Sequence, residues 1–340
     1  MKVLTARAAG LRLALLGALL LGSMTLGLAA GPSALRPGAA LRALWAPDHA
    51  SAAADIALRV RLPRVLLAAA VGAALAVAGA LFQALLRNPL ADPYVLGVSG
   101  GAAVGGILAL SLGARIGWGA AAAPPAAFAG ALVTTAALYA VAGVRGRVSA
   151  THLLLTGVVF NAFASAGIVF VASLAGLTEG TSLFLWLIGS LSAVRADAAP
   201  VVGGFLALGL ACALPLLRDL DLLSLGEESA AQLGVDVARL QRVLLLSTSL
   251  MVGAAVSVAG LIGFVGLIVP HLLRLRLGPD HRLLVPAAAL AGAAFLVLCD
   301  TAARTLFGGR ELPVGAITAL AGGPLFLYLL RREQLRSSAP

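Results

Sequence analysis

Residues 61–101 read RLPRVLLAAAVGAALAVAGALFQALLRNPLADPYVLGVSGG, and this stretch decides the fold. It contains no charged residue between Val65 and Leu86. At about 1.5 Å of rise per residue, a helix of this length spans the ~30 Å hydrocarbon core of a bilayer. A polar turn with two prolines follows, and the chain returns to apolar sequence from Tyr94. So short a connection predicts two transmembrane helices that pack side by side in antiparallel orientation.

The composition places the chain in lipid. It has 340 residues, of which 61% are hydrophobic and 11% are charged, whereas soluble domains are about 25% charged. The mean hydropathy is +1.03. Backbone polar groups in a bilayer are satisfied only in helices or closed barrels, and long apolar runs without alternation favour helices. We therefore predict an all-α polytopic membrane protein with a single transmembrane domain over residues 1–340.

The charge pattern indicates orientation. The net charge of +10 comes from arginines between the apolar runs, and such residues favour cytoplasmic loops in membrane proteins. No aromatic side chains are interleaved with them as in a nucleic-acid-binding surface, so we expect no nucleic-acid partner. The two cysteines, Cys212 and Cys299, lie within apolar runs, where neither a disulfide nor a metal site is expected.

The first apolar run, residues 13–30, follows Lys2, Arg7 and Arg12. This is the basic start of a signal peptide, but no A-x-A cleavage site is evident. A first membrane span is the favoured interpretation, and a signal-like segment is the alternative. Eight further runs are long enough to be spans: 65–86, 94–112, 120–142, 152–175, 196–217, 243–261, 283–303 and 313–330.

The basic clusters predict a tenth span. If all of them face the cytoplasm, an even number of spans must separate each neighbouring pair. This holds when residues 263–277 form a short crossing that is kinked at Pro270. The sequence then predicts about ten transmembrane helices with both termini in the cytoplasm.

Two segments of nearly identical sequence predict an internal repeat. Residues 71–79 read VGAALAVAG and residues 252–260 read VGAAVSVAG, each with a proline ten residues further on. In the predicted topology the first copy runs inward and the second outward, which is typical of the inverted repeats of transporters. Chance similarity between two helices rich in alanine, valine and glycine is the alternative.

A hydrolase motif occurs around Ser99, where residues 97–101 fit G-x-S-x-G. That motif needs a preceding strand and histidine and acidic partners, which this apolar run does not provide. Gly97, Gly101 and Gly105 are spaced four apart, as in closely packed membrane helices. We therefore expect a packing role and no catalytic residue.

Metal binding and proton transfer have equally little support. The four histidines do not have the spacing of metal ligands, so no metal site is expected. Asp300 is the one candidate for an intramembrane proton carrier. It lies four residues before Arg304, and an ion pair within one helix is the simpler interpretation.

Residues 218–241 are too polar to span a membrane and too short to form a domain. They contain a short amphipathic segment with Ser224 as a candidate N-cap, Glu227 at the capping-box position and Gly234 as a candidate C-cap. A small helix presented in this way suits docking to another protein. An ordinary solvated loop is the alternative.

Taken together, these motifs resemble the permease subunit of ATP-binding-cassette importers for ferric siderophores, haem and vitamin B12. The resemblance covers the chain from Arg59 to Leu330. It rests on Arg61–Arg64, Gln83, Arg87–Ala91, Pro93, Gly97–Ala102, Leu225–Gly226, Ala230, Leu233–Gly234, Gly263–Leu267, Pro270–His271, Arg274, Asp280–Arg282, Asp300, Arg304, Glu311–Gly315 and Gly323–Pro324.

The resemblance implies an assembly in the bacterial inner membrane. Its members work as homodimers with the substrate path on the two-fold axis. Their partners are two cytoplasmic ATPase subunits and a periplasmic or lipoprotein substrate-binding protein. Lys2 is the only lysine, so this chain has no G-x-x-x-x-G-K-[ST] phosphate loop. We therefore expect ATP and magnesium to be bound by the partner subunit, with no cofactor on this chain.

The resemblance also implies three sets of site residues. The ATPase-coupling residues are Leu225, Gly226, Glu227, Ala230, Leu233 and Gly234. The cytoplasmic gate consists of Asn88, Leu90, Ser149, Ala150 and Thr151. The residues expected to receive carboxylates of the binding protein are Arg61, Arg64 and Arg304.

The predicted function is the import of an iron chelate, a ferric siderophore or haem, driven by ATP hydrolysis on the partner. Cobalamin is the alternative substrate within the family, because these permeases share their motifs. A secondary transporter driven by an ion gradient is the alternative from another class, and it would need intramembrane carboxylates. A membrane-embedded hydrolase would depend on Ser99 alone.

Overall fold

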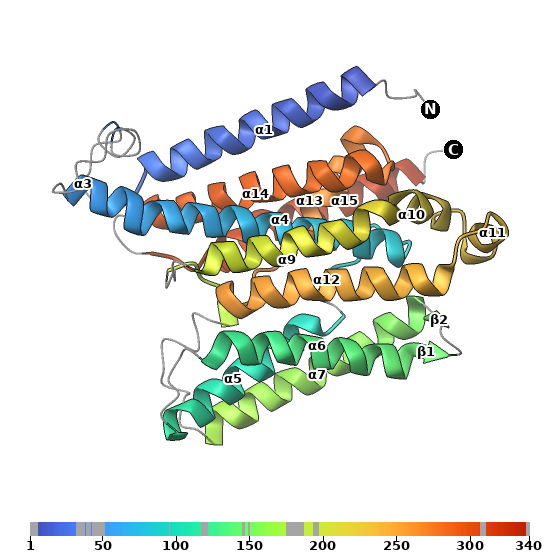
Figure 1. The fold of residues 1–340 in the computed structure, drawn as a ribbon, viewed down its shortest axis with the longest axis horizontal. Coiled ribbons are helices and arrows are strands. Elements are labelled where there is room, and N and C mark those ends of the chain that lie inside the picture. The colour runs from blue at the N-terminus through green and yellow to red at the C-terminus, as the bar shows by residue number, and fades with distance from the viewer. Residues whose placement is uncertain are drawn as a thin grey trace.

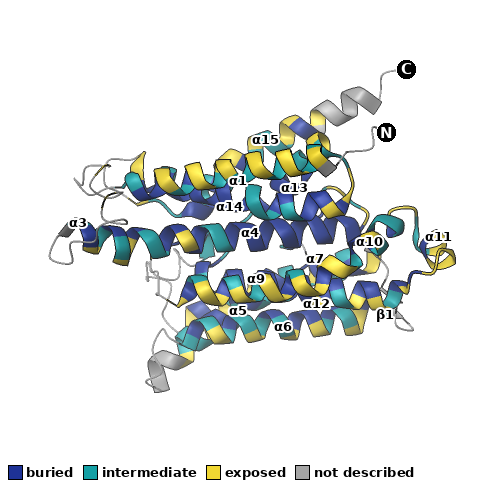
Figure 2. Ribbon diagram, turned by 45° about the horizontal axis from the view of Figure 1, so that its top comes forward, coloured by how far each residue is buried: buried dark blue, intermediate teal, exposed yellow. Residues whose placement is uncertain are grey.

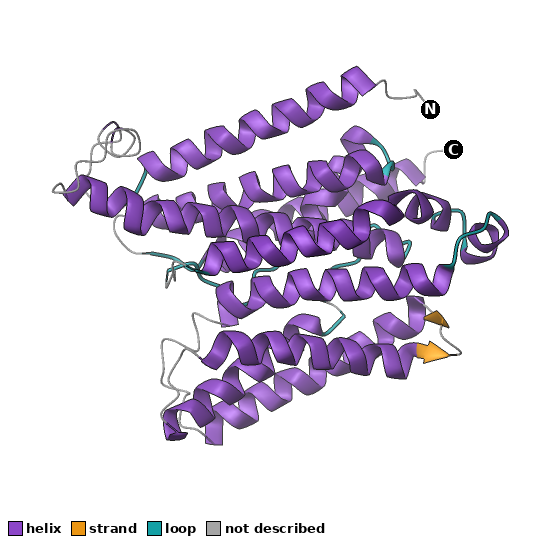
Figure 3. Ribbon diagram, in the orientation of Figure 1, coloured by secondary structure: helices purple, strands orange, loops and turns teal. Residues whose placement is uncertain are grey.

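The computed structural model describes residues 6–31, 38, 42, 52–94, 96–116, 122–144, 147–148, 150–174, 187–192, 197–306 and 311–337. These residues form a bundle of long helices with a small two-stranded hairpin (Figures 1 and 3). The first half contains α1 (Ala6–Ala29), α3 (Ala52–Asp55), a π-helical turn (Ile56–Arg61), α4 (Leu62–Leu85), α5 (Val98–Ile116), α6 (Ala123–Ala142), β1 (Gly143–Val144), β2 (Arg147–Val148) and α7 (Ala150–Leu174).

The second half continues with helices alone. It contains α9 (Ala198–Ala213), a 3-10 turn (Leu214–Leu216), α10 (Leu217–Leu223), α11 (Glu227–Gln232), α12 (Val237–Ala259), α13 (Val265–Leu277), α14 (His281–Thr305) and α15 (Val314–Ser337). The strands β1 and β2 pair in antiparallel orientation, with Gly143 opposite Val148.

The central helix is α4, the helix of the stretch quoted first. It packs against α9, α12, α13 and α14, and Figure 2 shows it buried along most of its length. Its alanine and glycine residues allow this close packing because they let neighbouring backbones approach. A Cβ on Gly72 would lie 2.3 Å from the Gly292 carbonyl oxygen, and one on Gly79 would lie 1.9 Å from that of Gly266.

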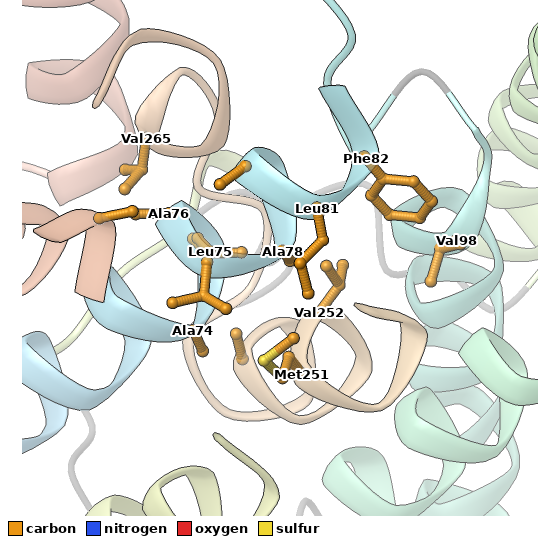
Figure 4. Packing of buried hydrophobic residues seen from close by; sticks show 14 of the residues in the cluster. Ala74, Leu75, Ala76, Ala78, Leu81, Phe82, Val98, Met251, Val252 and Val265 are labelled. Carbon is orange, nitrogen blue, oxygen red and sulfur yellow. The ribbon is translucent and has the colours of Figure 1, made fainter. Parts of the chain in front are cut away.

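The core around α4 joins segments that are far apart in the sequence. Figure 4 shows Leu75, Leu81 and Phe82 of α4 beside Met251 and Val252 of α12. All five side chains are at most 1% exposed. In lipid, helix association depends on van der Waals packing, because acyl chains are as apolar as the side chains and the hydrophobic effect does not drive helices together. The prediction that the two helices around the polar turn pack side by side is wrong: α5 packs against α6, α7 and α12 and has little contact with α4.

The nine apolar runs of the sequence are helical in the described residues, and the tenth crossing stays a prediction. Seven helices are long and apolar enough to cross a membrane, and Val98–Leu112 and Val314–Leu329 are shorter apolar helices. The predicted tenth crossing is α13, which contains Pro270. The run favoured as a first span is helical as α1.

The chain between α12 and α13 is extended. Gly260 and Phe264 have φ angles of 70°, a region that non-glycine residues rarely occupy. The Ile262 amide within this break donates a 2.7 Å hydrogen bond to the Tyr94 hydroxyl, so a backbone group freed by the break is satisfied.

The two similar segments have different structural surroundings. Residues 71–79 lie in the middle of α4, which continues to Leu85, whereas residues 252–260 end α12 at the extended break. Pro89 lies beyond the end of its helix and Pro270 lies inside α13. The similarity therefore does not extend to the helix boundaries, and the inverted repeat stays a prediction.

The bundle has two distinguishable ends. At one end lie α10, α11 and the β1–β2 hairpin, and we call it the α11 end (Figure 1). At the other end lies α3, and we call it the α3 end (Figure 1). The helix α4 runs from the α3 end toward the α11 end, and α14 runs back in the opposite direction.

Candidate functional site

The predicted coupling segment forms two short helices at the α11 end. The helix α10 buries Leu217, Leu220 and Leu223, whereas Ala230 is the one buried residue of α11. Hydrophobic side chains on one side of α10 therefore fix it to the bundle. The helix α11 stands further out, as Figure 1 shows.

Two glycines with positive φ angles flank α11. Gly226 has a φ of 111° and Gly234 a φ of 90°, which are favourable for glycine alone. The helix ends at Gln232 with Leu233 as its C-cap, so Gly234, the predicted C-cap, lies one position beyond it. The predicted capping box is wrong: Gly226 is the N-cap of α11, and the Ser224 hydroxyl donates to the Asp221 carbonyl oxygen of α10 at 2.6 Å.

The coupling residues divide by exposure. Leu225 is 64% exposed and Leu233 is 59% exposed, so two large apolar side chains flank α11 on the surface. Ala230 is fully buried within the segment. The two leucines can contact a partner, and Ala230 holds the segment together.

A hydrogen bond between two side chains attaches α10 to the beginning of α14. His281 Nδ1 lies 2.5 Å from Asp221 Oδ1, and the His281 amide donates to the same oxygen at 3.1 Å. The His281 side chain is buried. The resemblance included His281 but assigned it no role, and Asp221 was not singled out. A charge in a polar loop has many possible partners, so the sequence did not identify this contact.

The predicted gate turn follows α4 directly. The Arg87 amide donates to the Ala84 carbonyl oxygen at 3.1 Å and the Asn88 amide to that of Gln83 at 3.0 Å, which is the Schellman ending of a helix. The Asn88 side-chain oxygen accepts the Leu90 amide at 2.9 Å. Asn88 therefore orders its own turn and does not cap the following helix.

The other predicted gate residues lie at the start of α7. Ser149 lies outside the described residues, Ala150 begins the helix, and Thr151 is exposed. The β1–β2 hairpin that precedes them is at the α11 end (Figure 1). The structure therefore places the start of α7 at the same end of the bundle as the coupling segment. The gate itself stays a prediction.

A half-buried carboxylate, Asp92, lies in the turn between α4 and α5. Its side chain accepts the Tyr94 amide at 2.9 Å. Desolvation raises the pKa of Asp92 to about 6, against the effect of this hydrogen bond, which lowers it. The carboxylate is therefore partly protonated a little below neutral pH.

The three predicted docking arginines are at or near the α3 end, and all three are buried. Arg61 is 3%, Arg64 6% and Arg304 3% exposed. This conformation of the chain therefore does not present them at the surface, and the docking role stays a prediction. In the predicted topology these arginines face outward, against the positive-inside trend, and the structure provides a reason for that exception.

That reason is a network of ion pairs inside the bundle. Arg64 Nε lies 3.0 Å from Asp300 Oδ1, and Arg64 Nη1 lies 2.9 Å from Glu311 Oε2. Arg304 Nε lies 3.0 Å from Asp300 Oδ2, which confirms the predicted pair within one helix. Asp300 is thus neutralised by two arginines, and the network connects α4 to α14.

The same arginines fix the end of α1. Arg61 Nη1 donates to the carbonyl oxygens of Leu28 and Ala29 at 2.8 and 3.0 Å. Arg304 Nη2 donates to that of Gly27 at 3.2 Å. The last carbonyls of a helix lack partners within the helix and carry partial negative charge, so guanidinium groups stabilise them.

The hydrolase and metal interpretations gain nothing from the geometry. A Cβ on Gly101 would lie 2.7 Å from the Gly130 carbonyl oxygen, and one on Gly105 would lie 2.2 Å from that of Ala126. The predicted packing role of these two glycines, between α5 and α6, is confirmed. Within the described ranges no group of three or more histidine, cysteine or acidic residues could hold a metal ion.

Comparisons with known proteins give one consistent result. The model of the FecCD transport family matches residues 18–332. The cobalamin import system permease of Halobacterium salinarum is 46% identical over 278 residues, 82% of this chain and 74% of that protein. The hemin transport system permease of Yersinia pestis is 41% identical over 310 residues, 87% of this chain and 89% of that protein.

A solved structure supports the fold. It is described as an inward-facing conformation of a metal-chelate type ABC transporter, and it superposes with a TM-score of 0.82. The sequences are 31% identical, and the alignment covers 95% of this chain and 99% of that one.

Proposed function

The chain belongs to the FecCD transport family, and from this premise we propose that it imports an iron chelate, a ferric siderophore or haem. It is a permease of the ABC-importer type, and the family match over nearly its whole length carries the proposal. The matched relatives include importers of different cargo, so the sequence motifs alone do not choose among substrates.

Cobalamin is the second candidate cargo. The relative from Halobacterium salinarum is named as a cobalamin importer, and that observation favours the alternative. Both candidate cargoes are bulky metal-organic complexes, and an uptake measurement distinguishes between them.

The energy source is an ATPase on the face of the α11 end. This end contains the predicted coupling segment, with the exposed leucines Leu225 and Leu233 on either side of α11. Apolar side chains at the centre of a contact that excludes water contribute most to association. Two copies of the chain would present two such segments to two ATPase subunits.

The α11 end faces the cytoplasm in this proposal, in the inner membrane of a bacterium, with both termini on that side. Arginines concentrate at this end, among them Arg87, Arg218, Arg239 and Arg242, in agreement with the positive-inside trend. The α3 end then faces a substrate-binding protein. Docking of its carboxylates on Arg61, Arg64 or Arg304 would require the network there to open.

Ion-coupled transport has less support than ATP-driven transport. Asp300 is held between Arg64 and Arg304, so its carboxylate is part of an ion-pair network that joins α4 to α14. A secondary transporter driven by an ion gradient would need a carboxylate that is free to carry ions, and Asp300, the candidate from the sequence, is engaged in this network.

The decisive experiment is uptake into proteoliposomes that contain the permease with its ATPase and binding protein. Haem, a ferric siderophore and cobalamin are offered separately. We expect uptake of one of them to require ATP, to stop with an ATPase active-site mutation and to survive an uncoupler. Uptake that stops with the uncoupler and survives the ATPase mutation would contradict the proposal.

A test of the coupling surface is the change Leu233→Asp. It should lower ATPase stimulation by the permease by about ten-fold, because losing an apolar contact at an interface centre costs ~1–2 kcal/mol or more. Gln232→Asp, on the exposed surface of α11, is the matched control. Normal stimulation by the Leu233 variant would remove this segment from the interface.

A further inference from the structure

Arg87 occupies a backbone position that normally belongs to glycine. Its φ is 50°, and it is the residue after the last turn of α4 in the Schellman ending described above. A left-handed conformation costs a non-glycine residue about 1–2 kcal/mol. An arginine in this position therefore requires a compensating role for its side chain.

The side chain of Arg87 reaches α11. Arg87 Nη2 lies 3.6 Å from Glu227 Oε1, and a Cβ built on Gly226 would lie 3.9 Å from Arg87 Nη1. The Arg87 and Glu227 side chains are 40% and 31% exposed. The separation is longer than a hydrogen bond, so the contact is a charge attraction with little geometric restraint.

The helix α11 is the adjustable part of the coupling segment. Its neighbour α10 is fixed by three buried leucines and by the Asp221–His281 pair. By contrast, α11 has glycine joints at both ends, Gly226 and Gly234. A force on α11 can therefore rotate it about these joints while α10 stays against α14.

We propose that Arg87 is a positioning residue that connects α11 to the gate turn. When the ATPase displaces α11, Glu227 moves the guanidinium of Arg87, and the backbone of Arg87 moves the adjoining turn. The hydrogen bond from the Leu90 amide to Asn88 makes that turn one unit, so Asn88 and Leu90 move together. This inference rests on the proposed function, in which the coupling segment contacts an ATPase.

A purely structural role would have other consequences. If Arg87 only stabilised the end of α4, its loss would lower the thermal stability of the protein and leave coupling unchanged. If it transmits motion, its charge must be opposite to that of residue 227. The quantity that changes is then the ratio of substrate uptake to ATP hydrolysis.

The experiment is a charge swap in the reconstituted transporter with its ATPase and binding protein. Arg87→Glu and Glu227→Arg are made singly and together, and uptake per ATP hydrolysed is measured with the transported complex. Each single variant should lose about 1.4- to five-fold in this ratio, the range that corresponds to the ~0.2–1 kcal/mol of an exposed pair. The double variant should recover most of the loss.

The matched control is the exposed pair Asp55–Arg59 at the α3 end, whose atoms lie 3.1 Å apart. The swap Asp55→Arg with Arg59→Asp should leave the ratio unchanged. Thermal unfolding of every variant should follow that of the parent protein. A loss of stability in the Arg87 variant with a normal ratio would show that the role is structural and overturn the inference.

The outcomes also separate this inference from the proposed function. If the parent permease neither stimulates the ATPase nor binds it, the proposed function fails and this inference fails with it. If the parent protein is coupled and both single variants couple equally well, only the Arg87–Glu227 connection is overturned. A double variant that does not recover would likewise overturn the connection.

Discussion

The arginines at the two ends of α4 have opposite surroundings. Near its start, the Arg64 side chain is 7% exposed and lies 3.0 Å from Asp300 and 2.9 Å from Glu311. Just beyond its end, Arg87 is 40% exposed and lies 3.6 Å from Glu227. Short buried ion pairs fix two helices relative to each other, whereas a long exposed pair can lengthen or break at little cost.

The difference indicates where the bundle can change shape. At the α3 end, α1, α4 and α14 are held by the same few guanidinium groups, so they must move together. At the α11 end, one weak contact, Arg87–Glu227, connects α11 to the gate turn. Glycines with positive φ angles flank α11 on both sides. We therefore expect transport-related motion to begin at the α11 end.

The largest expected effect is that of Asp300→Ala. It leaves Arg64 and Arg304 buried without their shared carboxylate, and breaking a buried pair by removing one partner costs about 3–5 kcal/mol. The free energy of unfolding in detergent is the measurement. Asp55→Ala removes one partner of an exposed pair and is the control, with less than about 1 kcal/mol expected. Equal losses in both variants would contradict the distinction between buried and exposed ion pairs.

Glutamine substitutions compare the two peripheral glutamates directly. Glu311→Gln should cost about 1 kcal/mol, because Arg64 loses a charge-assisted hydrogen bond to a partly exposed partner. Glu227→Gln should cost less than about 0.5 kcal/mol. Thermal unfolding of the two variants side by side gives the order, and a reversed order would place the rigid end at α11.

Salt should separate the two ends in a different way. At 1 M ionic strength the Debye length is about 3 Å, so an exposed pair is screened and a buried pair much less so. The stability difference between parent and Asp300→Ala should therefore persist in 1 M NaCl. The coupling defect of Glu227→Arg should shrink to less than about half. A defect that is unchanged by salt would mean that the Glu227 contact is not electrostatic.

A pH dependence of stability is also expected from the gate turn. The pKa of Asp92 is raised to about 6 in the folded protein, so the folded state binds this proton more tightly than the unfolded chain does. Its contribution to stability therefore falls as pH rises from about 4 to about 6. The unfolding temperature of Asp92→Asn minus that of the parent should be larger at pH 7.5 than at pH 5. The same difference at both pH values would contradict this assignment.

The helices were predictable because lipid imposes a simple length rule on apolar runs. The predicted span 65–86 corresponds to α4 at Leu62–Leu85, and the tenth span, at α13, followed from the alternation of basic loops. The Asp300–Arg304 pair was predictable because both residues lie on one helix, four residues apart.

The contacts between distant residues were not predictable. Arg64 and Asp300 are 236 residues apart, and nothing in either local sequence indicates the other. The docking role of the arginines was an implication of the family resemblance, and their position at the predicted outer end agreed with it. Burial decides between an external and an internal partner, and burial depends on how α1, α4 and α14 pack. The predicted capping box of α11 was also wrong. Gly226 takes the N-cap position of α11, and Ser224 belongs to the end of α10.

The separation of Arg64 from Asp300 also has a consequence for the synthesis of the protein. At about 5–20 residues per second, the ribosome needs roughly 10–50 s to make the 236 residues that separate them. During this time α4 is inserted, but Arg64 has no Asp300 to pair with. We expect the nascent chain to need protection by the insertion machinery until α14 emerges. A chain that terminates before Asp300 would leave this guanidinium unpaired and be a substrate for membrane quality control.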